Sequence, residues 1–178
     1  MTWKSFHNRG EILRAVIAAA DARRDGILPM DVDGVAETFA DELTLLAALQ
    51  LRWHTRLAGR IEGELMHEPL DLEHAVIGAW QATADELPGI RMILDRYRAE
   101  PRDDAMAEAL AKATGKEHIL LAIMAGQASV HDTRGAVAAR RAGARIESLA
   151  RTTHVPVAVQ VPAPRSGLLD RLKAALAA

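Results

Sequence analysis

The sequence predicts an all-α protein: a helical bundle of five or six helices, followed by an extended C-terminal arm and a short terminal amphipathic helix. Alanine makes up 35 of the 178 residues, and it favours helices because it loses no side-chain entropy on entering one. Apolar residues recur at three- and four-residue spacing, which is the periodicity of amphipathic helices. β-branched residues are sparse outside residues 152–161. These observations favour helices over strands.

In the first hundred residues the pattern predicts a long helix over 5–24, a short turn at 35–39, a long helix ending near 66, a helix that starts at 71, and a further segment over 90–97. Thr38 and Asp41 have the spacing of a capping box at the start of the second long helix. Asp71 is the expected cap of the next one. Pro88 then removes a hydrogen bond and clashes with the preceding turn, so we expect either a kink or a break there.

The second half predicts two more long helices. Asp103 or Asp104 caps the first, and Gly115 is a candidate point at which it splits. Its segment 119–124 is apolar nearly all round, which is typical of a bundle centre or a subunit interface. The last long helix is expected from Asp132 to Arg151. We therefore expect a bundle domain over 1–151, and an arm over 152–178 that holds an extended stretch and a short amphipathic helix at 168–176.

The composition excludes several chemistries. The chain has no cysteine, which removes disulfides and thiolate sites. We find no secretory leader and no apolar run near the ~20 residues of a membrane span, so the expected location is the cytoplasm, away from membranes. Phosphate-binding loops, a nucleophile elbow and a regular helix–loop–helix calcium loop are also missing from the sequence. No cofactor is expected.

A ligand pocket is one candidate site. Trp53, His54, Trp80 and Tyr97 fall on helices that are expected to pack together, and pockets between bundle helices are common ligand locations. A break at Pro88 would help to open such a pocket. The alternative for His54 is an ordinary hydrogen-bonded histidine of the core.

A metal site is a second candidate, built from Glu64, His67 and His74. The full pattern of a di-iron carboxylate bundle is absent, because only one Glu-x-x-His occurs and it lies at a helix end before Pro69. The alternative is that these side chains are solvated or cap helices.

Basic residues gather near the C-terminus. Residues 1–131 carry a net charge of −7 and residues 132–178 one of +5. Arg134, Arg141 and Arg145 share a helix face, which suits an anion-binding site. The alternative is pairing with the acidic body. Aromatic residues are absent from this region, which argues against a nucleic-acid partner.

One short stretch resembles a known family. Ile12-Leu13, the alanines 18–20, Gly26 and Val35-Ala36 resemble the first two helices of a TetR-type regulator. The resemblance covers about forty residues and implies a ligand domain in the later helices. The turn and recognition helix that should follow Val35-Ala36 have no room before the next helix, so the resemblance implies no DNA reading and we assign no family.

Three functions follow from these features. The first is a non-enzymatic cytosolic bundle that acts through self- or partner association, most simply as a homodimer. The second is a small-molecule-binding helical domain, regulator-like but without a DNA-reading helix. The third is a metal-dependent enzyme. The sequence ranks them in that order and leaves the ligand and the partner open.

Overall fold

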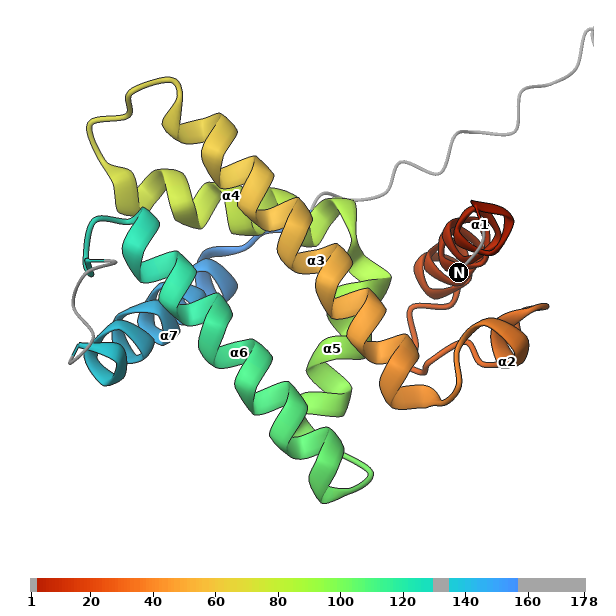
Figure 1. Cartoon of the computed structure of the whole chain (residues 1–178). Helices are drawn as coiled ribbons and strands as arrows, with labels where there is room; N and C mark the ends of the chain where they lie inside the picture. Colours follow the sequence, from red (N-terminus) through yellow and green to blue (C-terminus); the bar gives the residue numbers. More distant parts are fainter. Residues whose placement is uncertain (1–2, 130–134, 157–178) are drawn as a thin grey trace, which may run out of the picture.

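The computed structural model describes residues 3–129 and 135–156. Over these residues the chain forms seven helices and no strand, so the all-α prediction is confirmed (Figure 1). The helices are α1 (Trp3–Arg23), α2 (Val35–Thr38), α3 (Glu42–Leu65), α4 (Leu72–Glu86), α5 (Pro88–Ala99), α6 (Asp104–Met124) and α7 (Ala136–Thr153). None of the described helices is long and apolar enough to cross a membrane.

Local signals explain most helix starts. The side chains of Asp41, Asp71 and Asp103 each accept a hydrogen bond from the backbone N–H three residues later, at 2.7–3.0 Å. Asp71 and Asp103 were the expected caps. At α3 the cap is Asp41 alone, because Thr38 is the last residue of α2. The capping-box spacing of Thr38 and Asp41 therefore spans the short connection between α2 and α3.

Pro88 breaks the chain into two helices. Leu87 is both the C-cap of α4 and the N-cap of α5. Pro88 stands at the start of α5, where its missing N–H removes no hydrogen bond of the helix. Gly89 lies against the end of α1, where an added Cβ would lie 2.4 Å from the carbonyl carbon of Ala20. Its N–H donates to Asp21 Oδ1 at 2.8 Å. The Pro-Gly pair thus turns the chain and lets α1 dock on α5.

The second half of the described chain contains two long helices, α6 and α7, and α6 is not divided in two. α6 runs through Gly115 without a split, and its most extensive contact is with α7. The segment 119–124 is only partly covered: Leu121 and Ala122 are buried, and its other members are half-buried. α7 begins at Ala136, and Asp132, its predicted start, lies outside the described residues. Of the arm predicted over 152–178, residues 152 and 153 belong to α7 and residues 157–178 lie outside the described part of the chain.

The core is centred on α3 and is rich in leucine. Trp53 of α3 and Trp80 of α4 meet edge to face, with their ring centroids 5.8 Å apart. Both rings are almost completely buried and pack with apolar residues of α4 and α5. α3 contacts α1, α4, α5 and α6, and in Figure 1 it runs between α6 and α1. This position leaves one strip of α3 uncovered.

Candidate interaction surface and buried ion network

Leu51 stands out on the uncovered strip of α3. Its side chain is 65% exposed, whereas Leu45, Leu46 and Leu49 of the same helix are buried. Ala47 lies four residues before Leu51, so the two share one side of the helix. A large exposed leucine in line with a small residue gives this strip a ridge with apolar surface beside it.

An apolar groove of about 390 Å³ lies on one side of this ridge, between α3 and α6. We call it the α3–α6 groove. Three of its residues are alanines, Ala47, Ala109 and Ala113, which leave room for another chain to approach closely. Its other lining residues are Leu43, Leu46, Gln50, Leu51, His54, Leu110, Lys112 and Lys116.

A second groove of about 530 Å³ lies on the other side, between α1 and α3, and we call it the α1–α3 groove. It shares Ala47 and Leu51 with the first groove. Its remaining lining residues are Arg9, Gly10, Leu13, Thr44, Ala48, Arg52 and Thr55. Leu51 is therefore a ridge between two apolar grooves.

The charges at the grooves have a single sign. Lys112 and Lys116 line the α3–α6 groove, and Arg9 and Arg52 line the α1–α3 groove. No aspartate or glutamate lines either groove. Lys112, Lys116 and Arg52 are exposed and form no ion pair with a described residue, so their charge faces the solvent around the grooves.

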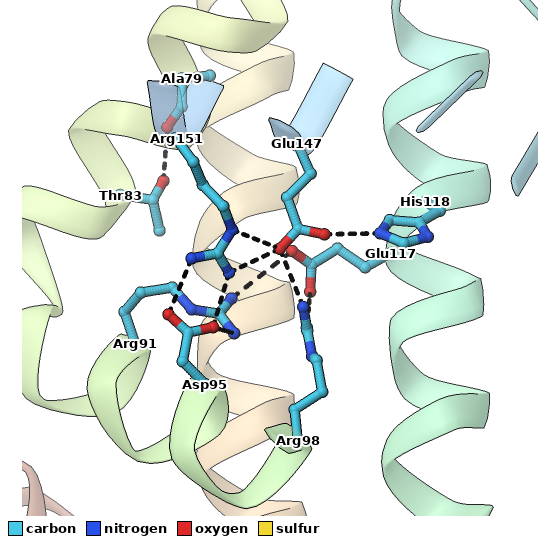
Figure 2. A network of polar contacts seen from close by, with 9 residues as sticks. All are labelled: Ala79, Thr83, Arg91, Asp95, Arg98, Glu117, His118, Glu147 and Arg151. Carbon is cyan, nitrogen blue, oxygen red and sulfur yellow. Dashed lines mark hydrogen bonds and ion pairs between the residues drawn. The ribbon is translucent and has the colours of Figure 1, made fainter. Parts of the chain in front are cut away.

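A network of ion pairs joins α5, α6 and α7 (Figure 2); its centre is buried, whereas the side chains of Arg151 and Asp95 are 35% and 36% exposed. Glu147 of α7 lies at its centre: its Oε2 lies 2.6 Å from His118 Nε2, and its Oε1 accepts from Arg98 at 2.9 Å. Arg151 donates to the same Oε1 at 2.7 Å and to both oxygens of Asp95, at 2.6 and 2.9 Å. The network thus fixes three helices relative to one another.

Glu117 and Arg91 form the deepest part of the network. Glu117 is fully buried, and its two oxygens lie 3.8 Å from Arg91 Nη1 and 3.9 Å from Arg98 Nη2. These distances are too long for hydrogen bonds, and neither oxygen has another hydrogen-bond partner among the described residues. Arg91 pairs with Asp95 at 2.7 Å. Such groups depend strongly on each other's charge, because they are removed from water.

The network lowers the pKa values of Glu147 and Asp95. Burial alone would raise the pKa of Glu147, but the hydrogen bond to His118 and the charges of Arg98 and Arg151 outweigh it and hold the pKa far below its usual range. The same balance applies to Asp95, whose pKa is lowered by Arg151 and Arg91 against the effect of burial. Both carboxyl groups are therefore ionised at neutral pH.

Two arginines of the network also lie over the tryptophan rings. The guanidinium of Arg91 is 4.6 Å from the centre of Trp53, and that of Arg151 is 5.0 Å from the centre of Trp80. Such stacking favours a cation when it is shielded from water. A polar pocket of about 310 Å³ adjoins this region, with Trp80, Asp85, Asp95, Arg151 and His154 among its lining residues. His154 Nε2 lies 3.0 Å from Asp85 Oδ1.

The four residues of the predicted ligand pocket are not gathered around one cavity. Trp53 and Trp80 touch in the core, and Trp80 also lines the polar pocket. His54 lines the α3–α6 groove instead. Tyr97 is buried, with its hydroxyl 3.3 Å from an Arg102 nitrogen. Of the four predicted residues, only Trp80 therefore lines the polar pocket.

The three predicted metal ligands are not brought together, which corrects that expectation. Glu64 and His67 lie at the end of α3, beside Arg56 and Arg60 in a shallow pocket that does not include His74. His74 is an exposed residue of the first turn of α4. Among the described residues there is no group of three or more histidine, aspartate or glutamate side chains that could hold a metal ion.

The arginines predicted to bind an anion are also engaged differently. Arg134 lies outside the described residues. Arg145 donates to both oxygens of Glu73 on α4, at 2.8 and 2.6 Å, and Arg141 is exposed. For Arg145 the structure therefore has the alternative arrangement, in which the basic helix pairs with the acidic body.

Neither the role of Leu51 nor the ion network was predicted from the sequence. Two pairs of the network, Arg91–Asp95 and Glu147–Arg151, have the four-residue spacing of helical ion pairs, and this was the available signal. For Leu51 the signal was weaker: it extends the apolar pattern of α3 to a third side. Comparisons with protein-family models, curated proteins and solved structures find no match for this chain.

Proposed function

We propose that the protein acts by association with another protein, and that the Leu51 ridge and its two grooves form the contact surface. The observation that carries this proposal is the exposed leucine between two apolar grooves on an otherwise well-packed helix. Contiguous exposed apolar surface of this kind favours a binding site, whereas single exposed apolar residues need no explanation. An apolar helix laid into a groove is a common form of such recognition.

A homodimer is one form of this association. A ridge beside a groove on the same surface allows two copies to exchange ridges across a two-fold axis, as a self-complementary interface requires. The proposal assigns no reaction to the protein and places its partner in the compartment predicted from the sequence, the cytoplasm.

The test compares the full chain with its Leu51→Asp variant. Sedimentation velocity up to about 0.5 mM measures self-association, and fluorescence anisotropy measures binding of a helical peptide with a leucine stripe and an uncharged outer face. We expect at least one of the two to occur with a Kd below about 1 mM and to weaken at least about tenfold in L51D.

Leu70→Asp is the matched control, because Leu70 is fully exposed in the α3–α4 connection and lines neither groove. A monomer that does not bind the peptide would overturn the proposal, as would equal effects of L51D and L70D. Both variants should unfold at the same urea concentration as the wild type, since neither leucine is buried.

Small-molecule binding is a second candidate, and the polar pocket beside Trp80 favours it. This pocket combines an aromatic edge with two aspartates and with Arg24, Arg91 and Arg151, a mixture that suits a ligand bearing both charge and a flat ring. A thermal-shift screen of the full chain tests it. Ligands that raise the midpoint of the wild type should lose that effect when His154 is replaced by alanine. A screen without hits would discard this candidate.

A further inference from the structure

We infer that the partner bound by the α3–α6 groove is an acidic amphipathic helix of another protein. The inference rests on the proposed function and adds the chemistry of the partner. It follows from the charge around the groove, from its small residues, and from the spacing of its two lysines.

The charge around the groove is complementary to that of an acidic partner. Lys112 and Lys116 line the groove, and Arg52 lines the neighbouring α1–α3 groove on the other side of Leu51. All three are exposed, and no carboxylate lines the groove. Glu108, one turn before Lys112, does not line it and forms no ion pair with either lysine among the described residues. A partner with carboxylates along its flanks would meet these charges, and complementary charge of this kind sets partner choice.

The spacing of the two lysines matches that of residues on a partner helix. Lys112 and Lys116 are four residues apart on one helix, so their Cα atoms are about 6 Å apart along the axis of α6. A partner helix lying along the groove presents residues four apart at the same interval. We therefore expect acidic residues at positions i and i+4 beside its apolar stripe. Ala109 and Ala113, on the same part of α6, let that stripe approach closely.

The same charges disfavour two other occupants. In a symmetric pair of this chain, two sets of cationic rims would face each other, which is unfavourable. The chain's own segment 168–176 carries Arg171 and Lys173 against a single Asp170, so it too would bring net positive charge to a positive rim. An acidic helix from a different protein is the occupant that removes this repulsion.

The experiment uses three helical peptides of about 18 residues that share one leucine stripe and differ only in the outer face, which is acidic, uncharged or basic. Their binding to the full chain is measured by fluorescence anisotropy at low salt. We expect the acidic peptide to bind at least about tenfold more tightly than the basic one, and to lose most of this advantage at about 0.5 M NaCl.

Charge reversal tests the assignment to the groove. Lys112→Glu should reduce the acidic peptide's advantage several-fold, and adding Lys116→Glu should reverse the preference so that the basic peptide binds more tightly. Arg141→Glu is the matched control, because it makes the same charge change at an exposed residue of α7 that lines neither groove. It should leave the preference unchanged.

The outcomes separate this inference from the proposed function. If all three peptides bind alike and L51D abolishes them, the surface is an association site but its partner is not defined by acidity, and the inference is wrong. A Leu51-dependent homodimer that excludes the acidic peptide would also overturn it while leaving the proposed function standing. Acidic-peptide binding that appears only in the Leu168→Asp, Leu172→Asp variant would also overturn the inference, because the groove would then be the binding site of the chain's own segment 168–176. Absence of any Leu51-dependent binding would overturn both.

Discussion

At the scale of the residue, the fully buried Glu117 illustrates how the charges of the network depend on one another. It has no hydrogen bond to a described residue, and its nearest cations are Arg91 and Arg98. The network as a whole balances three arginines against three carboxylates, with His118 at its edge. Removing one member therefore leaves a charge that is both buried and uncompensated, which costs more than the pair itself contributes.

We predict that Arg91→Met lowers the free energy of unfolding by about 3–5 kcal/mol, because it strands Glu117 in the interior. Adding Glu117→Leu should restore at least about half of this loss, since two arginines and two carboxylates then remain in balance. Urea unfolding of the three proteins measures both steps. Arg141→Met, at an exposed arginine, should change little. A double variant as unstable as the single one would contradict this interpretation.

Glu147 gives a prediction about pH. Its pKa is lowered in the folded protein, so the folded state keeps the carboxylate ionised while the unfolded chain takes up a proton near the usual value of 4.5. The stabilisation is therefore complete above that pH and is lost as the pH falls below it. The stability difference between wild type and Glu147→Gln should be largest near neutral pH and should shrink between about pH 5 and pH 3. Urea unfolding across this range measures it, and a difference independent of pH would count against the assigned hydrogen bonds.

At the scale of the element, the crossing of α6 and α7 depends on the absence of a side chain at Gly143. A Cβ at this position would lie 1.8 Å from the carbonyl oxygen of His118, which no real contact allows. Because that oxygen belongs to the backbone of α6, the two helices would have to separate. Their separation would also move His118 and Glu147, which join the same two helices.

We predict that Gly143→Ala lowers the free energy of unfolding by about 2 kcal/mol or more, despite the better helix propensity of alanine. Gly59→Ala is the control in α3, where a Cβ would meet nothing within 4 Å. It should raise the free energy of unfolding by about 0.5–1 kcal/mol, since alanine loses less backbone freedom on folding than glycine. Equal effects at the two sites would show that the helices do not pack this closely.

Element boundaries were largely predictable because local chemistry decides them. Asp71 and Asp103 begin helices through hydrogen bonds to N–H groups three residues away, and Pro88 stands where a helix can start but not continue. Gly115 misled the prediction because a glycine inside a helix costs only about 1 kcal/mol, which packing can offset. Here the side chain of Arg140 from α7 lies against it.

The candidate sites were harder to predict because they depend on which elements pack together. α3 is apolar on three sides, and only the positions of α1 and α6 decide that the side with Leu51 stays uncovered. Likewise, the four-residue spacings of the ion network are visible in the sequence, but the pairing of Arg98 with Glu147 spans 49 residues. No local pattern specifies such a contact.

At the scale of the whole molecule, the charge division seen in the sequence takes a specific structural form. The basic helix α7 is joined to the acidic body by two kinds of ion pair. Arg151 pairs with the buried Glu147, which also pairs with Arg98 of α5, whereas Arg145 meets Glu73 at the surface, where the side chain of Arg145 is 48% exposed. Dissolved salt screens exposed charges efficiently and buried ones much less, so the two kinds should respond differently to ionic strength.

We predict that Glu73→Gln costs no more than about 1 kcal/mol at low salt, and that this cost falls by about half or more at about 0.5 M NaCl. The larger cost of Arg91→Met should change little over the same range, because the surroundings of Arg91 exclude the ions that would screen it. Urea unfolding of both variants at the two salt concentrations measures the difference. If both costs fell together, the buried network would be open to solvent and salt, and the attachment of α7 would be an ordinary surface contact. If only the cost of Glu73→Gln falls, the buried ion pairs hold the basic helix α7 in place.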